Sequence, residues 1–219
     1  MEFRPFGKIA RLNREVIITE KIDGTNGQIL ILDFKSYEEY YLARTPYSTE
    51  GTAEVEENWD REKKKNGAIL VGDFLMRPAS RSRYLNEKQD NYGFWKWCNI
   101  NKEQLALLGP GHHYGEWWGN GINRGYGLGE KRFSLFNTAR WGEGKQLRPS
   151  CCGIVPVLAS GTSFSDVPRC LQMLRDEGSY AAPGYRKPEG VVVSHTASNS
   201  LFKVTLEDDD KPKGANENA

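Results

Sequence analysis

Glycine and proline divide this chain into short segments, and that punctuation limits what it can fold into. The sequence holds 23 Gly and 10 Pro in 219 residues. Short apolar or alternating runs bounded by Gly, Pro, Asn and Asp are typical of β-strands. The sequence therefore predicts strands over residues 15–19, 28–34, 40–45, 68–74, 113–118, 132–137, 154–158, 190–195 and 201–206.

Two longer segments carry a helical pattern. From residue 91 to 108, apolar side chains recur at mixed three- and four-residue steps. A second helix is predicted after Ser165, an N-cap candidate, and it ends at Gly178. Many strands with few helices predict an α+β fold with a substantially antiparallel sheet. The first two strands, joined by the turn at residues 23–27, are expected to form a hairpin or a strand–turn–strand unit.

Composition excludes several classes of protein. A hydrophobic content of 38% is enough for a packed core. No run approaches the roughly 20 apolar residues of a membrane span, and the chain starts without an apolar signal region. The four cysteines form no C-x-x-C pair and there are three histidines, which argues against a zinc site and a disulfide scaffold. We therefore expect a cytoplasmic protein with no membrane partner.

The charge balance hides local asymmetry. With 30 Lys+Arg against 29 Asp+Glu, the chain lacks the overall basic excess of many nucleic-acid binders. Residues 77–88 and 121–148 are nevertheless locally basic, and Tyr84 lies within the first segment. Basic residues near aromatic rings fit a groove for single strands or ends, and a solvated surface of mixed charge is the alternative.

Residues 20–27 (EKIDGTNG) are the most informative segment. Lys21 follows a β-rich run and precedes a turn that contains Gly24. A lysine so placed can reach a cleft while the amides of the turn face phosphate oxygens. Its amine is a nucleophile only when deprotonated. On this motif alone, a solvated turn is the simpler interpretation.

The motifs C-terminal to Lys21, taken in order, add weight to a functional interpretation. Further along the chain come an Arg in YLART, a YGEWWG strand, an FSLFN strand, a PEGVVV strand and an FKV strand. In this order the sequence resembles the covalent nucleotidyltransferases, and most closely ATP-dependent RNA ligases of the phage RNA ligase 2 type. That family has K-x-[DH]-G-x-N, then an Arg, a G-E strand, an F-x-x-F strand, an E-G-[VI]-V strand and a K-x-K strand. The resemblance runs from Lys21 to Lys203.

The resemblance implies a fold, a reaction and a set of roles. The fold would be an ATP-grasp-like nucleotidyltransferase module of largely antiparallel sheets flanked by a few helices, over residues 1–206, with a polar tail at 207–219. Lys21 would attack the α-phosphate of ATP to form lysyl-AMP, AMP would pass to an RNA 5′-phosphate, and a 3′-hydroxyl would seal the strand. Lys203 would neutralise the α-phosphate, and Glu189 would be catalytic and hold Mg²⁺ or Mn²⁺. The nucleotide-binding residues would be Glu20, Asp23, Asn26, Arg44, Glu116 and Phe136.

Two residues depart from the family pattern. Asn137 stands where the phage ligases usually have Asp, and Leu201 or Thr205 stands where a second lysine is usual. Lys211 or Lys213 could supply the missing charge by folding back. A DNA ligase, a GTP-using capping-type enzyme and a non-catalytic nucleotide- or nucleic-acid-binding relative remain as alternatives.

The substrate is expected to be RNA ends or a nicked duplex. Sixteen residues follow Lys203, too few for a further domain. The sequence therefore predicts a bare transferase module, with which a partner chain could act in substrate selection.

Several of these residues also have purely structural interpretations. Glu116 could be a cross-strand partner on a half-exposed sheet and Glu189 a turn carboxylate. Either Phe133 or Phe136 could belong to the core. Packing roles are expected for Trp117, Trp118 and Trp141, and structural or exposed positions for His112 and His113.

Overall fold

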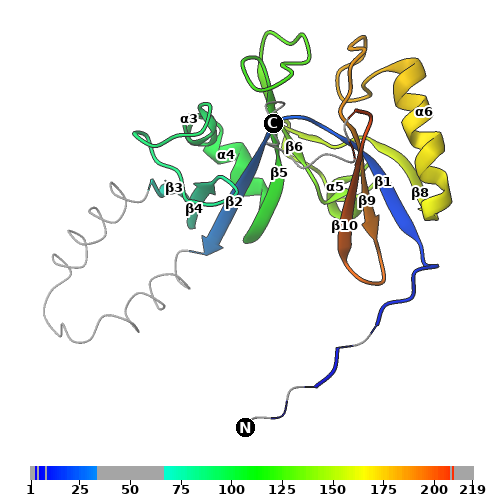
Figure 1. The fold of residues 1–219 in the computed structure, drawn as a ribbon. Coiled ribbons are helices and arrows are strands. Elements are labelled where there is room, and N and C mark those ends of the chain that lie inside the picture. The colour runs from blue at the N-terminus through cyan, green and yellow to red at the C-terminus, as the bar shows by residue number, and fades with distance from the viewer. Residues whose placement is uncertain (1–2, 4, 8, 34–66, 208, 210–219) are drawn as a thin grey trace, which may run out of the picture. The chain divides into compact units, whose positions relative to one another are not determined.

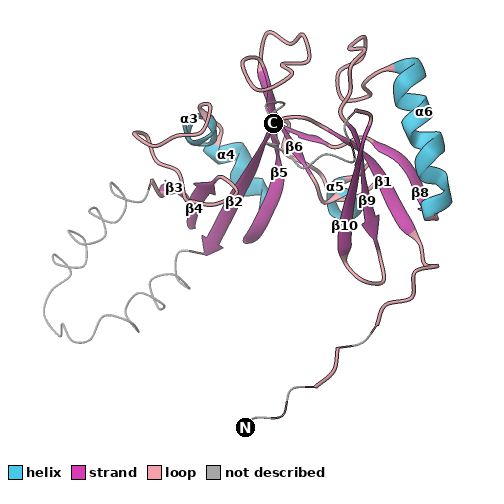
Figure 2. Ribbon diagram, in the orientation of Figure 1, coloured by secondary structure: helices cyan, strands magenta, loops and turns pink. Residues whose placement is uncertain are grey.

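Alternating apolar side chains build two separate β-sheets, which the computed structural model of the chain describes over residues 3, 5–7, 9–33, 67–207 and 209. The chain divides into two units, one made of residues 1–23 and 155–219 and the other of residues 24–154. Each unit has its own sheet and its own hydrophobic cluster. Strands dominate both units (Figures 1 and 2).

The first unit, residues 1–23 and 155–219, holds a four-stranded antiparallel sheet in the order β10-β9-β1-β8. Its strands are β1 (Val16–Lys21), β8 (Val157–Thr162), β9 (Gly190–His195) and β10 (Ser200–Thr205). Helix α6 (Val167–Glu177), preceded by the 3-10 turn η2 (Phe164–Asp166), covers one face. Because strand side chains alternate between faces, Val16 and Ile18 are buried against Cys170 and Leu174 of the helix.

The second unit, residues 24–154, holds a six-stranded sheet in the order β3-β4-β2-β5-β6-β7. Its strands are β2 (Thr25–Asp33), β3 (Ile69–Val71), β4 (Phe74–Ala79), β5 (Gly111–Gly119), β6 (Lys131–Leu135) and β7 (Cys152–Ile154). All neighbours are antiparallel except β6 and β7, which are parallel. The short helices are α3 (Phe94–Ile100), α4 (Lys102–Leu105), the 3-10 turn η1 (Ala106–Leu108) and α5 (Thr138–Trp141).

An aromatic cluster fills the core between this sheet and its helices. The rings of Phe94 and Phe133 lie 5.0 Å apart between centroids, and those of Trp97 and Trp117 lie 5.1 Å apart. A Cβ at Gly27 would come within 2.8 Å of the Phe94 ring, so this position of β2 admits only glycine. The sheet thus has one face covered by helices and a second face, which carries Gln28, His112 and Tyr114.

The structure confirms an α+β fold with largely antiparallel sheets, and it changes several details. The first two strands form a strand–turn–strand unit and not a hairpin, because β1 pairs with β8 and β9 whereas β2 pairs with β4 and β5. The single helix over 91–108 is also wrong. Asn101 ends α3 and precedes α4, and its side-chain amide donates to the Trp97 carbonyl. The predicted strand at 154–158 is broken, since Ile154 ends β7, Pro156 follows, and Val157 begins β8.

Smaller differences concern the ends of elements. The segment 68–74 is two strands joined by a turn at Gly72 and Asp73, and β6 ends at Leu135, not at Asn137. Helix α6 begins at Val167 after Asp166, not after Ser165. The strand predicted at 40–45 lies outside the described residues, as does nearly all of the tail at 207–219.

Two further observations concern packing and membranes. Trp117, Trp118 and Trp141 are buried, as expected, and the four cysteines are free thiols. Within the described ranges, no helix is long and apolar enough to cross a bilayer.

Candidate active site

Lys21 is the last residue of β1, the strand that lies between β9 and β8. Its Nζ lies 2.6 Å from Oε2 of Glu189, and the two side chains are 17% and 5% exposed. The pairing register explains this contact, because Lys21 is opposite Gly190 and Glu189 directly precedes it. The carboxylate of Glu189 is therefore a buried partner of the lysine and not a solvated turn residue.

Gly190 allows the strands to meet closely beside this pair. Its φ is 153°, and a Cβ there would lie 2.1 Å from the carbonyl oxygen of Val204 in β10. The backbone N–H of Leu206 donates to the Glu189 carbonyl at 2.9 Å. The glycine of the E-G motif thus lets β10 pack against the start of β9, next to Glu189.

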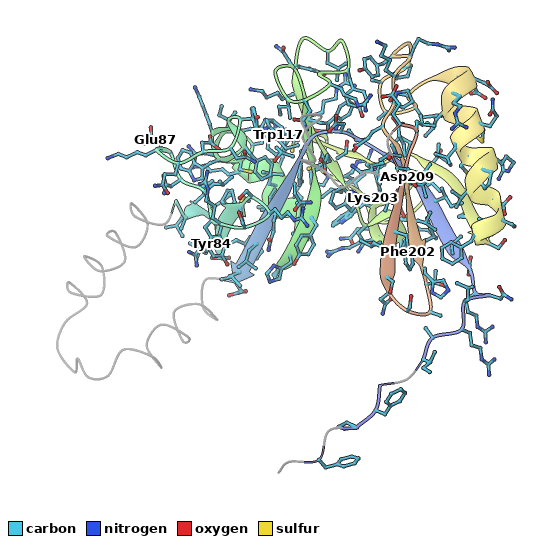
Figure 3. All side chains as sticks on the ribbon, viewed as in Figure 1. Tyr84, Glu87, Trp117, Phe202, Lys203 and Asp209 are labelled. Atoms are coloured by element: carbon cyan, nitrogen blue, oxygen red, sulfur yellow. The ribbon has the colours of Figure 1, made fainter. Side chains whose placement is uncertain are left out.

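Lys203 lies in β10 with an exposed side chain (Figure 3). It is opposite Val192, which is opposite Thr19 of β1. Directly opposite residues share a face, and so do residues two apart on a strand. Lys203 and Lys21 therefore belong to the same face of the four-stranded sheet.

Thr205 takes a different role from a second lysine. Its backbone N–H and hydroxyl both donate to Oδ1 of Asp209, at 2.8 and 3.2 Å. The position carries an acidic contact where the family pattern has a base. Lys211 and Lys213 lie outside the described residues.

Glu20 points to the opposite face from Lys21 and is 1% exposed. Its carboxylate accepts hydrogen bonds from the Ser179 hydroxyl at 2.6 Å and from the backbone N–H groups of Tyr180 and Ala181, each at 2.8 Å. Burial raises the pKa of the Glu20 carboxyl above its ordinary value, although these three donors act in the opposite direction. Its contacts join β1 to the segment that follows α6 in the same unit.

Gly24 begins the second unit, and Glu116 of β5 holds it. The backbone N–H of Gly24 donates to Oε1 of Glu116 at 3.1 Å, and the Asn123 side-chain amide donates to the Gly24 carbonyl at 2.6 Å. A Cβ at Gly24 would lie 2.5 Å from the Trp117 carbonyl oxygen. The glycine of K-x-D-G is therefore required for close packing against β5.

Asn26, Glu116 and Phe136 share one region of the six-stranded sheet. Asn26 is directly opposite Glu116 in the β2–β5 pair. Phe136 follows β6, is 38% exposed, and donates its backbone N–H to the Tyr114 carbonyl at 3.0 Å. Phe133 is fully buried, so of the two rings in F-x-x-F it is Phe133 that belongs to the core.

Asn137 has a local structural role. Its side chain accepts a hydrogen bond from the backbone N–H of Arg140 at 3.0 Å, which caps α5. An aspartate there would cap equally well. The departure from the family residue therefore leaves the start of α5 intact.

His112 and His113 differ, as the alternation of β5 requires. His112 is exposed, whereas His113 is buried and its Nε2 lies 2.8 Å from the Gly109 carbonyl oxygen. Burial lowers the pKa of His113.

The expected site residues thus fall into two groups, one on each sheet. Lys21, Glu189 and Lys203 share the four-stranded sheet, and Asn26, Glu116 and Phe136 share the six-stranded sheet. Asp23 ends the first unit, and Arg44 lies outside the described residues. Sequence reasoning missed Asn123, for which a glycine-rich loop directly after the G-E strand was the available signal.

The donor set for a metal is small. Among the residues that the structure describes, no three His, Cys, Asp or Glu side chains gather as a metal site. Mg²⁺ commonly binds one or two carboxylates together with substrate phosphates and water. The buried carboxylate of Glu189 is compatible with that mode.

Together these contacts define an α+β protein that pairs a lysine with a carboxylate on one sheet and presents a carboxylate and an exposed ring on another. Comparison with known proteins gives the class. The family model described as RNA ligase matches residues 14–205. The chain belongs to the RNA ligase family.

Two solved structures of Naegleria gruberi RNA ligase are similar to this chain. One is a lysine-to-alanine variant with ATP and Mn at 16% identity, and the other is an apo lysine-to-alanine variant at 17%. In both, the match covers 88% of this chain and 49% of the other, with a TM-score of 0.49. This chain thus spans about half the length of those ligases. No curated protein matches.

Proposed function

We propose that this chain is the nucleotidyltransferase module of an ATP-dependent RNA ligase that works through lysyl-AMP. The observation that carries the proposal is the contact of 2.6 Å between Lys21 Nζ and Glu189 Oε2, in a chain of the RNA ligase family. It supports the proposal because it joins the lysine of K-x-D-G to the carboxylate of E-G-V-V, which are 168 residues apart.

The reaction has three steps. The neutral amine of Lys21 attacks the α-phosphorus of ATP, the bond to pyrophosphate breaks, and the amine loses a proton. An oxygen of the RNA 5′-phosphate then attacks the same phosphorus, the P–N bond breaks as the Lys21 nitrogen takes up a proton, and AMP becomes linked to the RNA end. Finally a 3′-hydroxyl attacks the 5′-phosphorus, loses its proton, and AMP leaves.

The remaining residues would bind and orient the nucleotide. Glu116 offers a carboxylate to the ribose, and Phe136 an exposed ring to the adenine. Asp23, Asn26 and Arg44 are proposed on their motif positions. Glu20, whose carboxylate accepts from Ser179 and two backbone amides, would act by positioning.

Glu189 would hold Mg²⁺ or Mn²⁺. When bound, such an ion would neutralise charge on the phosphates, which is much of what phosphoryl-type transfer needs. Lys203 would supply further positive charge from the face that it shares with Lys21.

Formation of the covalent adduct tests the proposal. The protein is incubated with Mg²⁺ and radiolabelled ATP or GTP, then denatured and separated on a gel. We expect labelling by ATP, its loss in Lys21→Ala, and its retention in the matched control Lys102→Ala, because Lys102 lies in α4. Persistent labelling of Lys21→Ala would falsify the assignment of the nucleophile. A label from GTP alone would indicate capping chemistry, and no label would favour a non-catalytic relative.

Sealing tests the role of Glu189 and the substrate. Glu189→Ala should lose the joining of a nicked RNA or of RNA ends. Unchanged joining by this variant would remove its proposed metal role, and equal joining of DNA would point to the DNA ligase alternative.

A further inference from the structure

The second face of the six-stranded sheet carries exposed aromatic rings beyond the residues proposed for ATP. On β5, Tyr114 is 48% exposed and His112 is also exposed. Their rings are stacked, with centroids 5.9 Å apart and an angle of 10° between the planes. Solvent-exposed sheet positions are usually polar, so this exposed pair of parallel rings offers a surface to a partner.

Hydrogen bonding fixes the orientation of one of these rings. Nε2 of Gln28 lies 2.7 Å from Nδ1 of His112. Gln28 is opposite Tyr114 on β2, so the three side chains belong to one face. Rings that are held before a ligand arrives lose less freedom on binding than mobile ones.

A cation lies on the same face, beyond the rings. Arg77 of β4 is opposite Leu30, which is opposite His112, so the row across three strands places Arg77 with the two rings. The Arg77 guanidinium carbon lies 3.8 Å above the centroid of the Tyr84 ring, which is 42% exposed (Figure 3). Its Nε is buried, and the described residues provide no hydrogen-bond partner for it.

The rings also adjoin the proposed nucleotide residues. Tyr114 precedes Glu116 by two positions on β5 and accepts a hydrogen bond from the Phe136 backbone. Residues two apart on a strand lie roughly 7 Å from each other. A strand that brings its end to Glu116 and Phe136 would meet Tyr114 and His112 next.

We propose that His112, Tyr114, Arg77 and Tyr84, here called the aromatic face, bind unpaired bases and phosphates of an RNA strand. The inference rests on the proposed function and names its substrate: a single-stranded segment, not a continuous duplex. Aromatic rings stack on bases of any sequence, and a guanidinium neutralises the phosphates between them. In a duplex, the faces of the bases are already stacked on neighbouring bases.

Fluorescence anisotropy without ATP tests the aromatic face. The probe is an unstructured 5′-phosphorylated RNA of about 12 nucleotides, and a blunt RNA hairpin serves as the duplex. Tyr114→Leu should weaken single-strand binding about 5- to 50-fold, whereas Tyr114→Phe should retain it. Tyr92→Leu is the matched control, because Tyr92 is 52% exposed and its carbonyl accepts from Trp117 on the helix-covered side.

Salt dependence separates stacking from charge. For a single strand, loss of one phosphate contact lowers the slope of log K against log salt by about 0.7. Arg77→Gln should show that change, and Tyr114→Leu should keep the wild-type slope.

The outcomes separate this proposal from the proposed function. If wild type and folded Tyr114→Leu bind the single strand equally well, the proposed role of the aromatic face is wrong, even if the wild type forms lysyl-AMP. The role is also wrong if Tyr114→Leu loses as much affinity for the hairpin as for the single strand, or if Tyr114→Phe loses as much single-strand affinity as Tyr114→Leu. A loss of affinity in Tyr114→Leu that is confined to the single strand supports the proposed role of the aromatic face, even if the wild type forms no adduct and the ligase proposal fails.

Discussion

Replacing Glu189 by glutamine tests whether its contact with Lys21 holds the end of β1 to the start of β9. The two charged atoms lie 2.6 Å apart, and the Glu189 side chain is 5% exposed. Loss of one partner of a buried ion pair typically costs about 3–5 kcal/mol. Because Lys21 is 17% exposed, its unpaired ammonium keeps some hydration. We therefore expect a loss of about 2 kcal/mol for Glu189→Gln.

A double-mutant cycle isolates the pair. Lys21→Met removes the charge but keeps an unbranched side chain, and it takes the lysine partner away from the more deeply buried carboxylate. Removing both charges leaves no ion without a partner, so the double variant should be more stable than the sum of the singles predicts. We expect a coupling free energy of about 1–2 kcal/mol.

Amide hydrogen exchange measures the effect unit by unit. A loss of 2 kcal/mol raises the opening equilibrium about 30-fold, and this should appear in peptides from β1 and β9. All six tryptophans fall within residues 59–141. Tryptophan fluorescence in urea therefore reports residues 24–154, which should be unaffected. Unchanged exchange in β9, or strictly additive singles, would refute the reasoning.

Buried contacts elsewhere in the chain support three further predictions. Glu20→Ala leaves two backbone N–H groups without an acceptor and should lower the free energy of unfolding by about 2–4 kcal/mol. Glu20→Gln keeps an oxygen and should lower it less. Equal amide hydrogen exchange at residues 179–181 in the two variants would contradict this. In Gly24→Ala the new Cβ meets the carbonyl of Trp117, so the urea midpoint of tryptophan fluorescence should fall. The control is Gly129→Ala, where a Cβ meets nothing within 4 Å. Equal midpoints in the two variants would contradict the prediction. Because burial lowers the pKa of His113, the unfolded state binds more protons below about pH 6.5. As the pH falls below that value, the free energy of unfolding should therefore decrease by at most about 1.4 kcal/mol per pH unit. If His113→Gln shows the same dependence of stability on pH as the wild type, the prediction is wrong.

Local patterns identified most strands but not their partners. Residues 190–195 are correctly predicted as a strand because the run is apolar and lies after Pro and Gly. Its neighbour β1 lies some 170 residues away in the sequence, and an alternating pattern holds no information on which strand pairs with it. The hairpin was expected because short connections usually join neighbours. Here the turn leads from one sheet into another.

Two errors had signals in the sequence. Pro156 lies inside the expected strand at 154–158, and proline is disfavoured within a sheet because it donates no hydrogen bond. Asn101 lies inside the expected helix, and asparagine favours helix ends because its amide bonds nearby backbone groups. Short-range side-chain chemistry outweighed the apolar periodicity at both positions.

The candidate site residues were proposed from the order of the motifs, and their geometry was not foreseen. The motif order located Lys21, Glu116 and Glu189, but the ion pair depends on a register of β1 and β9 that brings Lys21 opposite Gly190. The burial of the Glu20 carboxylate could not be foreseen either, since its donors come from a loop at residues 179–181.

The Lys21–Glu189 contact also bears on the proposed chemistry. Attack on a phosphate needs the lone pair of the lysine nitrogen, and here a carboxylate oxygen lies 2.6 Å from that nitrogen. The contact would therefore have to loosen before the proposed nucleophile could reach a phosphate. The backbone of Glu189 is anchored by Leu206 and by the register of β9, so only the side chain has to turn to release the lysine. Under the proposed function, release of Lys21 would then depend on what else the Glu189 carboxylate binds, so the residue proposed to hold the metal would also affect the first step.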